Sequence, residues 1–362
     1  MIHVRPATHA DEAAWQAFLG STESGDFLHD WAWAEVAAFD GQPQRRFVAE
    51  EEGRLVALAA AQVRPVPAGR SFWYVPHGPV LDLGDPRAGE RLRAVIIGLR
   101  EAARAANAVA VKLEPRVERG SPEHGVFAEA RGLRDTGETL QVGQTRIVRL
   151  GSDEELLAGF DKDTRYAVRR AEREGVTVTA VEDPHDTDAI DALHALVRET
   201  QARAGFPMPP LERYRTAWRA LGGAGRAVIL EARREGSLLA SAMLVVEGRR
   251  SYYLFSGSKR EERGEPKRYA SYALQWAMLR LARERGAVEH DLWGIAPPGA
   301  GREHPWHGVG LFKKGFGGRE VVWAGSWDIV VDPTLYRARR TLGIARGWIR
   351  PVTRGLRRVL RR

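Results

Sequence analysis

Two adjacent lysines near the carboxyl end of the chain have the surroundings best suited to chemistry. They lie in the run Gly308-Val309-Gly310-Leu311-Phe312-Lys313-Lys314-Gly315-Phe316-Gly317-Gly318. Glycines let the backbone approach a ligand closely, and an ammonium flanked by aromatic rings acts in a low local dielectric, where its field on a developing oxyanion is stronger. The run therefore suits stabilisation of a negatively charged intermediate, although a turn with solvated lysines has the same sequence features.

A second cationic feature is a row of arginines on a predicted helix in the middle of the chain. Asp163 or Thr164 is expected to cap the start of this helix, and Gly175 to end it. The arginines recur at four-residue intervals and so share one face: Arg165, Arg169 and Arg173. Their spacing alone favours an exposed, solvated face.

Other reactive groups are few. The chain has no cysteine, which excludes disulfides, thiol nucleophiles and thiolate metal sites. His304 and His307 form a weak metal motif, because no carboxylate or third ligand lies nearby in the sequence. We therefore expect no metal and no cofactor.

The strands and helices that must position these residues resemble an internal repeat, with copies at residues 46–115 and 226–295. Each copy has a strand, a glycine turn, a second strand, an aromatic strand, a long helix and a last strand. The long helices are expected at about residues 90–106 and 267–285. Because the order and the intervals agree between the copies, an internal repeat is a better explanation than chance.

Strand pairs followed by a long helix and another strand indicate an α+β fold, with mixed sheets in two domains. The acetyltransferase-like (GNAT-type) architecture is the natural candidate. We expect a first domain at residues 1–150 completed by about residues 320–336, and a second at residues 151–319. No apolar run is long enough to span a bilayer and the start is not of secretory type, so the expected location is the cytoplasm.

Charge is concentrated at the carboxyl end. The whole chain has a formal net charge of +8, yet residues 337–362 contain ten arginines and no acid. Apolar residues recur there at three- and four-residue steps, which is typical of an amphipathic helix on an anionic membrane or on RNA phosphates. A solvated, disordered terminus is the alternative.

A GNAT enzyme that uses acetyl-CoA would bind the pyrophosphate with a glycine turn that leads from a strand into a helix. The run Arg219-Ala220-Leu221-Gly222-Gly223-Ala224 has suitable residues, but it follows a predicted helix and precedes a strand. We interpret it as a linker, which weakens the hypothesis of acetyl-CoA binding.

Five motifs in order resemble the Fem family of aminoacyl-tRNA-dependent peptidoglycan-bridge transferases, most nearly the FemX type. They span about residues 27–336: Phe27-Leu28-His29-Asp30-Trp31-Ala32-Trp33, Tyr74-Val75-Pro76-His77-Gly78-Pro79-Val80-Leu81-Asp82, Thr164-Arg165-Tyr166 with Arg169-Arg170-Ala171-Glu172 and Gly175-Val176, Tyr253-Leu254-Phe255-Ser256-Gly257-Ser258, and Phe312-Lys313-Lys314-Gly315-Phe316-Gly317. The resemblance implies two tandem GNAT-type domains without acetyl-CoA, the first completed by the carboxyl-terminal part. It also implies transfer of an amino acid from charged tRNA to the peptide-stem amine of lipid II or its UDP-linked form. No long heptad-bearing insertion is present, so a coiled-coil arm is not expected.

The resemblance also implies roles for individual residues. Lys313 would stabilise the oxyanion formed when the amine attacks the aminoacyl ester, with Lys314 as the fallback. Glu114, in place of the family's strand-ending aspartate, would accept or relay the proton of the amine, although an exposed carboxylate beside Pro115 is an equal alternative. The candidates for substrate binding come from the matched positions: Phe312, Tyr214, Tyr253, Arg165 and Tyr74. Core packing is an equal alternative for Tyr214 and Tyr253.

Two departures leave the acceptor open. Ala37 stands where the family has a basic residue, and Pro209-Pro210 stands where it has an arginine. Contacts with the precursor's diphosphate would then come from elsewhere, for example from Arg45, Arg46 or Arg165. The alternatives to the Fem reaction are an acyl-CoA-dependent N-acyltransferase and a noncatalytic protein that binds RNA or a membrane.

Overall fold

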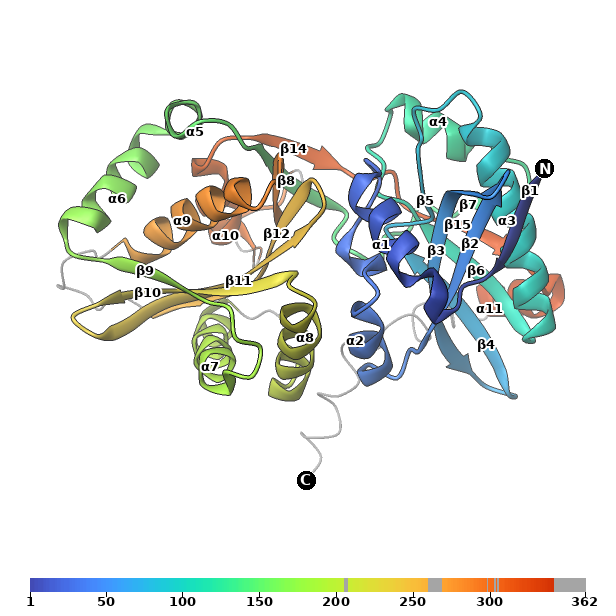
Figure 1. Ribbon diagram of the computed structural model, residues 1–362, viewed down its shortest axis with the longest axis horizontal. Coiled ribbons are helices and arrows are strands. Elements are labelled where there is room, and N and C mark those ends of the chain that lie inside the picture. Colours follow the sequence, from blue (N-terminus) through green and yellow to red (C-terminus); the bar gives the residue numbers. More distant parts are fainter. Residues whose placement is uncertain (205–207, 260–268, 298, 303, 305, 342–362) are drawn as a thin grey trace. The chain divides into compact units, whose positions relative to one another are not determined.

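The computed structural model describes residues 1–341 except 205–207, 260–268, 298, 303 and 305 (Figure 1). The described chain divides into two compact units, each built on one mixed β-sheet. The first unit contains Met1–Gly143 and the residues from Val322 onward, and the second contains Gln144–Val321. The mixed α/β fold predicted from the sequence is confirmed.

The first sheet has the strand order β1-β2-β3-β4-β6-β15-β7, with β5 paired to β3. Its strands are β1 (Ile2–Pro6), β2 (Gln44–Glu51), β3 (Arg54–Val66), β4 (Arg70–Pro76), β5 (Val80–Leu81), β6 (Ala108–Glu114), β7 (Arg134–Asp135) and β15 (Trp327–Val330). The helices of this unit are α1 (Glu12–Ser21), α2 (Trp33–Phe39), α3 (Ala88–Ala105), α4 (Pro122–Ala128) and α11 (Pro333–Thr341), with short 3-10 turns at His9–Asp11 and Phe27–His29.

Alternation along β3 explains how two layers of helices cover this sheet. Ala57, Ala59 and Ala61 lie in the core that contains the α3 residues Leu92, Val95 and Leu99, whereas Leu58 and Ala60 lie in a core with Trp15 and Leu19 of α1. Successive side chains of a strand point to opposite faces, so a strand of small apolar residues can support helices on both sides.

The second sheet has the order β14-β8-β13-β12-β11-β10-β9. Its strands are β8 (Gln144–Arg149), β9 (Thr177–Val181), β10 (Ala227–Arg234), β11 (Ser237–Glu247), β12 (Arg250–Ser258), β13 (Glu289–Gly294) and β14 (Arg319–Val322). The helices are α5 (Asp153–Gly159), α6 (Lys162–Arg173), α7 (Thr187–Ala204), α8 (Leu211–Gly223), α9 (Ala270–Glu284) and α10 (His307–Gly315). Figure 1 shows α6 and α9 on one side of this sheet and α7 and α8 on the other.

The predicted repeat is visible in the topology. The sequence β2-β3-β4-α3-β6 corresponds to β10-β11-β12-α9-β13, with two antiparallel pairings followed by a parallel one in both copies. A register shift in the first strand pair recurs too, after Ala49 in one copy and after Ala232 in the other. The second long helix begins at Ala270; residue 267, where we expected its start, lies outside the described residues.

The second unit is one continuous segment, and the chain returns to the first sheet after it. β15 follows β14 along the chain, yet it pairs with β6 and β7 in the first sheet. β8 follows β7, yet it lies between β13 and β14 in the second sheet. The sequence predicted that carboxyl-terminal residues complete the first domain, but it placed β8 within residues 1–150.

The described part of the basic carboxyl-terminal segment is folded. Helix α11 packs on the first sheet, where Tyr336 is buried and the Arg339 guanidinium lies 4.1 Å from the centre of the Phe72 ring. The backbone of residues 337–341 is therefore helical and belongs to the first unit. Residues 342–362 of the predicted amphipathic segment lie outside the described residues.

Candidate active site

Lys313 is held by a helix in the second unit. The glycine-rich run, which resembled a turn in the sequence, forms α10 from His307 to Gly315. Phe316 anchors the end of this helix in the core, and Gly315 lies so close to α6 that a Cβ there would meet the Thr164 hydroxyl at 2.2 Å. The Asp161 N–H donates to the Gly315 carbonyl at 2.9 Å. This docking fixes the direction in which α10 presents its lysine.

The two central strands of this unit separate beside the lysine. β12 and β13 pair in parallel only at Arg250–Glu289, Ser251–His290 and Tyr252–Asp291. Beyond that point β12 continues to Ser258, while β13 turns at Trp293, whose φ is +61°. The Lys313 ammonium lies at this separation and donates to the carbonyls of Gly294 at 2.7 Å and Trp293 at 3.4 Å.

Burial makes Lys313 lose its proton more readily than an exposed lysine does. The side chain is only 5% exposed, and burial lowers its pKa to about 7, although the nearby Asp291 carboxylate favours the charged form. Asp291 itself accepts hydrogen bonds from the Thr145 hydroxyl and from the Trp293 N–H. An ammonium has three N–H donors, and the two carbonyls account for two of them. Among the acceptors that the described residues supply, none takes the third donor, which is therefore the one suited to bind an oxyanion.

Aromatic side chains adjoin the lysine on the same face of the sheet. The Tyr253 ring centre lies 5.9 Å from the Lys313 nitrogen, and burial raises the Tyr253 pKa to about 12. Phe312 is half-buried and contacts Tyr272 and Phe316. Lys314 is exposed, so the structure separates the two lysines that the sequence left as alternatives. The structure thus brings Lys313, Phe312 and Tyr253 together.

Tyr214 lies elsewhere in the second unit. It belongs to α8, on the side of the sheet opposite α6 and α9 (Figure 1), and is 2% exposed. Its ring lies 4.2 Å from the Phe255 ring centre and 5.0 Å from that of His194. These contacts are core packing, which was the structural alternative for a tyrosine at this position.

Glu114 and Tyr74 belong to the first unit and bind each other. The Tyr74 hydroxyl donates to Glu114 at 2.5 Å, and the Leu140 and Gln141 N–H groups donate to the same carboxylate at 2.9 to 3.3 Å. Glu114 is 3% exposed and Tyr74 is fully buried. The alternative of an exposed carboxylate beside Pro115 is therefore wrong. Since O–H and N–H donors occupy the carboxylate, these contacts favour a positioning role over proton transfer.

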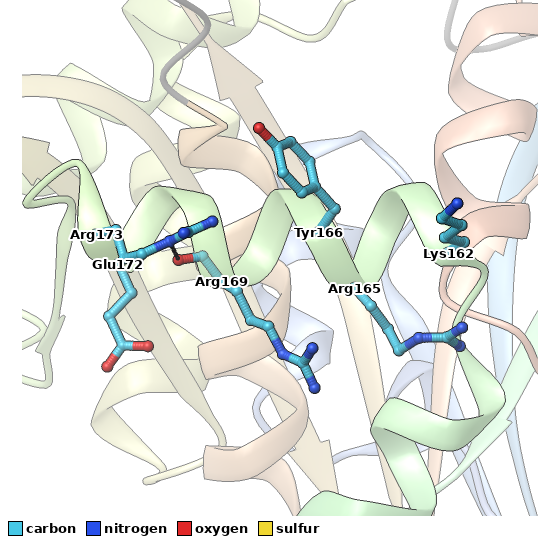
Figure 2. A pocket seen from close by; sticks show the side chains of 6 residues that line it. All are labelled: Lys162, Arg165, Tyr166, Arg169, Glu172 and Arg173. Atoms are coloured by element: carbon cyan, nitrogen blue, oxygen red, sulfur yellow. Dashed lines mark hydrogen bonds between the residues drawn. The ribbon is translucent and has the colours of Figure 1, made fainter.

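Helix α6 carries the predicted arginine row, as Figure 2 shows. Its cap is Asp161, whose carboxylate accepts from the Thr164 N–H at 2.6 Å, and not Asp163 or Thr164 as expected. The Arg165 guanidinium donates to the carbonyls of Leu157 and Phe160, so it joins α6 to the end of α5. Arg169 and Arg173 are exposed.

The two other arginines expected as candidates for phosphate binding lie in the first unit. The Arg46 guanidinium stacks 3.7 Å from the Trp31 ring centre and donates to the Trp31 carbonyl at 2.5 Å. Burial lowers its pKa to about 10. Arg45 lies 5.4 Å from the centre of the Trp73 ring. Both guanidinium groups therefore already contact tryptophan rings of their own unit.

The two motifs at residues 27–33 and 74–82 make buried contacts within the first unit. The His29 ring donates from Nε2 to the Pro76 carbonyl at 2.8 Å and accepts from the Ala60 N–H at 3.2 Å. The His77 ring lies 2.9 Å from the Asp26 carboxylate. Gly78 is required because a Cβ there would lie 2.3 Å from the His29 ring. The motifs of residues 27–33 and 74–82 therefore meet in one buried polar cluster.

Sequence reasoning missed the groups that hold Lys313: the Trp293 and Gly294 carbonyls and Asp291. Backbone acceptors leave no pattern in a sequence. Asp291 did give a signal, because it is a carboxylate within the apolar strand His290-Asp291-Leu292-Trp293.

Three expectations from the sequence concern cofactors, metals and membranes. The run Arg219–Ala224 is the end of α8 and its cap, so it leads from a helix toward β10 and not from a strand into a helix. Within the described residues, no group of three or more His, Asp or Glu side chains could hold a metal ion. No helix in the described ranges has both the length and the apolar character needed to cross a bilayer.

Comparison with known proteins identifies the fold and the family. The crystal structure of FemX superposes with a TM-score of 0.82 at 22% identity, over 93% of this chain and 99% of that one. A tandem GNAT protein from the clavulanic acid biosynthesis pathway superposes with a TM-score of 0.51 at 16% identity, over 92% and 99% of the two chains. The fold is therefore two tandem GNAT-type domains, as the sequence predicted.

Sequence comparison adds the family. The lipid II:glycine glycyltransferase of Staphylococcus aureus (strain MRSA252) is 25% identical over an alignment of 409 residues including gaps. The alignment covers 91% of this chain and 94% of that protein. Residues 11–124 and 223–343 match the FemAB family, and these segments contain both Glu114 and Lys313. Because they make up more than half of the chain, the protein belongs to the FemAB family, and it is an acyltransferase.

Proposed function

We propose that this enzyme transfers an amino acid from aminoacyl-tRNA to the peptide-stem amine of a peptidoglycan precursor and so builds an interpeptide bridge. The observation that supports this most is Lys313, a buried ammonium at the separation of β12 and β13 with one donor left for a ligand. Such a group suits a reaction that passes through a tetrahedral oxyanion.

In the proposed reaction, the amine attacks the aminoacyl ester carbonyl, a C–N bond forms, and the bond to the tRNA ribose oxygen breaks. Lys313 would stabilise the negative charge on the carbonyl oxygen. The amine loses one proton and the ribose oxygen gains one, so the step is balanced without an external oxidant or reductant. Neither a metal nor a cofactor beyond the charged tRNA is required.

The acceptor would be lipid II or its UDP-linked form. The relative named lipid II:glycine glycyltransferase supports lipid II as the acceptor and glycine as the amino acid. Because charged tRNA is made in the cytoplasm, the reaction would take place there or at the inner face of the membrane. The basic segment at residues 337–362 would favour anionic lipid at that surface.

The test is transfer of radiolabelled amino acids from a mixed pool of charged tRNA to lipid II and, separately, to the UDP-linked pentapeptide. Acetyl-CoA with labelled acetyl groups is the control donor. Label that moves from tRNA to either precursor supports the proposal and identifies donor and acceptor together. Label that moves only from acetyl-CoA would show an ordinary N-acetyltransferase instead.

A further inference from the structure

The exposed side of α6 begins at the helix that carries Lys313. The Asp161 N–H at the start of α6 is bonded to the Gly315 carbonyl at the end of α10. From there, Lys162, Tyr166, Arg169 and Arg173 fall within a sector of roughly 60° on the helix, at 3.6 residues per turn. We call these four residues the α6 row. It extends about 16 Å, at a rise of 1.5 Å per residue.

The α6 row is accessible and cationic. With Arg165 and Glu172 it lines a hollow of about 620 Å³, and Figure 2 shows these six side chains along α6. Lys162, Arg169 and Arg173 are exposed, and no ion pair joins them to a carboxylate among the described residues. Along the helix axis Arg169 and Arg173 lie about 6 Å apart, and Lys162 lies about 10 Å from Arg169. Several cations on one helix face suit a polyanion such as a nucleic-acid strand.

Aromatic rings connect the α6 row with the candidate active site. Tyr166 is 50% exposed and its ring centre lies 6.0 Å from that of Tyr269. Tyr269 lies 6.1 Å from Tyr272, and Tyr272 lies 5.2 Å from Phe312, the neighbour of Lys313. The last three rings are half-buried, so each keeps an accessible part. Aromatic rings beside a row of cations are typical of surfaces that bind single-stranded nucleic acid.

We propose that the α6 row and the aromatic rings from Tyr166 to Phe312 bind the single-stranded 3′ end of the donor tRNA, with phosphates on the cations and bases on the rings. This inference rests on the proposed function, because it places the aminoacyl ester at Lys313 and the rest of the strand along α6. A membrane is a poorer partner for this surface, since Ala167, Val168 and Ala171 of α6 are buried and leave no apolar face for lipid.

The first experiment measures binding of uncharged tRNA to the full chain over a series of salt concentrations. The variant Arg169→Gln/Arg173→Gln keeps good helix formers and removes two cations. We expect weaker binding at low salt and a slope of log K against log salt that is smaller by about 1.5, at roughly 0.7 to 0.9 for each phosphate that is no longer neutralised. The matched control is Arg93→Gln/Arg104→Gln, which removes two exposed arginines from α3.

A second pair of variants tests the aromatic part. Tyr166→Leu should weaken binding of a short single-stranded RNA with the tRNA 3′ sequence about tenfold, whereas Tyr166→Phe should bind like the original chain, because stacking needs only the ring. An unchanged salt slope in the arginine variant, or equal binding by the leucine and phenylalanine variants, would overturn the proposal. Loss of binding to anionic vesicles with unchanged RNA binding would also overturn it and would favour a membrane.

A third experiment separates failure of this inference from failure of the proposed function. Transfer is measured from full-length charged tRNA and from a minimal aminoacyl-adenosine ester, which lacks the preceding nucleotides. The arginine variant should have a raised KM for the tRNA and unchanged transfer from the minimal ester, whereas Lys313→Ala should lose both. If the original chain transfers from neither donor, the proposed reaction is wrong, and the binding experiments still decide whether α6 binds RNA.

Discussion

The same pair of strands is closed in one unit and open in the other. In the first sheet, β4 and β6 stay paired through Pro76 and Glu114, at the end of both strands. In the second, β12 and β13 separate after Tyr252 and Asp291. The closed pair, β4 and β6, ends at the Glu114 carboxylate, which accepts several hydrogen bonds. The open pair, β12 and β13, ends beside Lys313, whose ammonium is bonded to backbone carbonyls. The second repeat therefore has an opening beside Lys313, where the first repeat has a continuous pair of strands.

The largest test of this comparison is Lys313→Met, which removes the cation from the open pair. We expect kcat to fall about 1000-fold, since loss of one oxyanion donor typically costs 100- to 1000-fold. Stability should not fall, because a lysine whose burial lowers its pKa from 10.5 to about 7 is costly to keep charged. Transfer rates and urea unfolding check both expectations.

Lys314→Met is the matched control for that experiment, because its side chain is exposed on the same helix. It should keep nearly the full rate. Equal losses in both variants would contradict the assignment of Lys313 to the reaction.

The first unit, whose strands β4 and β6 stay paired, also contains a buried lysine. Unlike Lys313, this lysine forms ion pairs with carboxylates. Lys112 is fully buried and bonded to Asp328 at 2.9 Å and to Glu138 at 3.3 Å. Lys112→Met should lower the free energy of unfolding by about 3 kcal/mol, because it leaves Asp328 buried without its cation. Activity per folded molecule should be retained. The double variant Lys112→Met/Asp328→Leu should recover much of the stability, and a large loss of kcat in the single variant would break the distinction between the units.

Each unit also buries one neutral histidine, so both should respond to acid alike. Burial lowers the pKa of His29 and of His290 to about 4, against 6.5 in the unfolded chain. The stability due to this difference is present above pH 6.5 and is lost as the pH falls toward 4, because the unfolded chain takes up the protons first. Between pH 7 and pH 5 we expect a loss of roughly 2 kcal/mol for each histidine.

Unfolding in urea at several pH values measures this loss, and His29→Gln and His290→Gln should each remove part of the pH dependence. A pH-independent stability between 7 and 5 would show that folding does not lower the pKa values of these rings.

The smallest expected effect is that of Glu114→Gln in the closed pair. The amide oxygen can still accept from Tyr74 or from an N–H group, so stability should fall by about 1 kcal/mol. Transfer should change less than threefold if the carboxylate only positions its neighbours. A loss of kcat above a hundredfold without loss of stability would instead identify Glu114 as the proton acceptor.

The repeat could be predicted from the sequence because glycine turns, aromatic strands and long helices leave local patterns. The opening of β12 and β13 could not, since it depends on register and on the backbone at Trp293, which has no sequence pattern. The helix around Lys313 was missed because Gly308, Gly310 and Gly315 favour turns, whereas packing of Phe316 and contact with α6 stabilise a helix here.

Candidate residues that are adjacent in the sequence could be placed together correctly, whereas the location of the others depends on the three-dimensional fold. Lys313 and Phe312 are adjacent in the sequence and lie together at the opening. Tyr214 and Tyr253 looked equivalent as single tyrosines, yet they lie on opposite sides of one sheet, which only the three-dimensional pairing of α8 with β10 and of α9 with β11 decides.

Because β15 joins the first sheet only after the second unit, the first unit cannot be cut from the gene as one continuous segment. The ribosome synthesises β15 after the whole second unit, so the first sheet lacks a strand between β6 and β7 until residues 144–321 have been made. A fragment cut after Gly143 would lose that strand, and a fragment that begins at Asp153 would lack β8. Recombination that replaces one repeat with a homologous copy must therefore preserve the strands encoded outside it, such as β15 for the first sheet and β8 for the second.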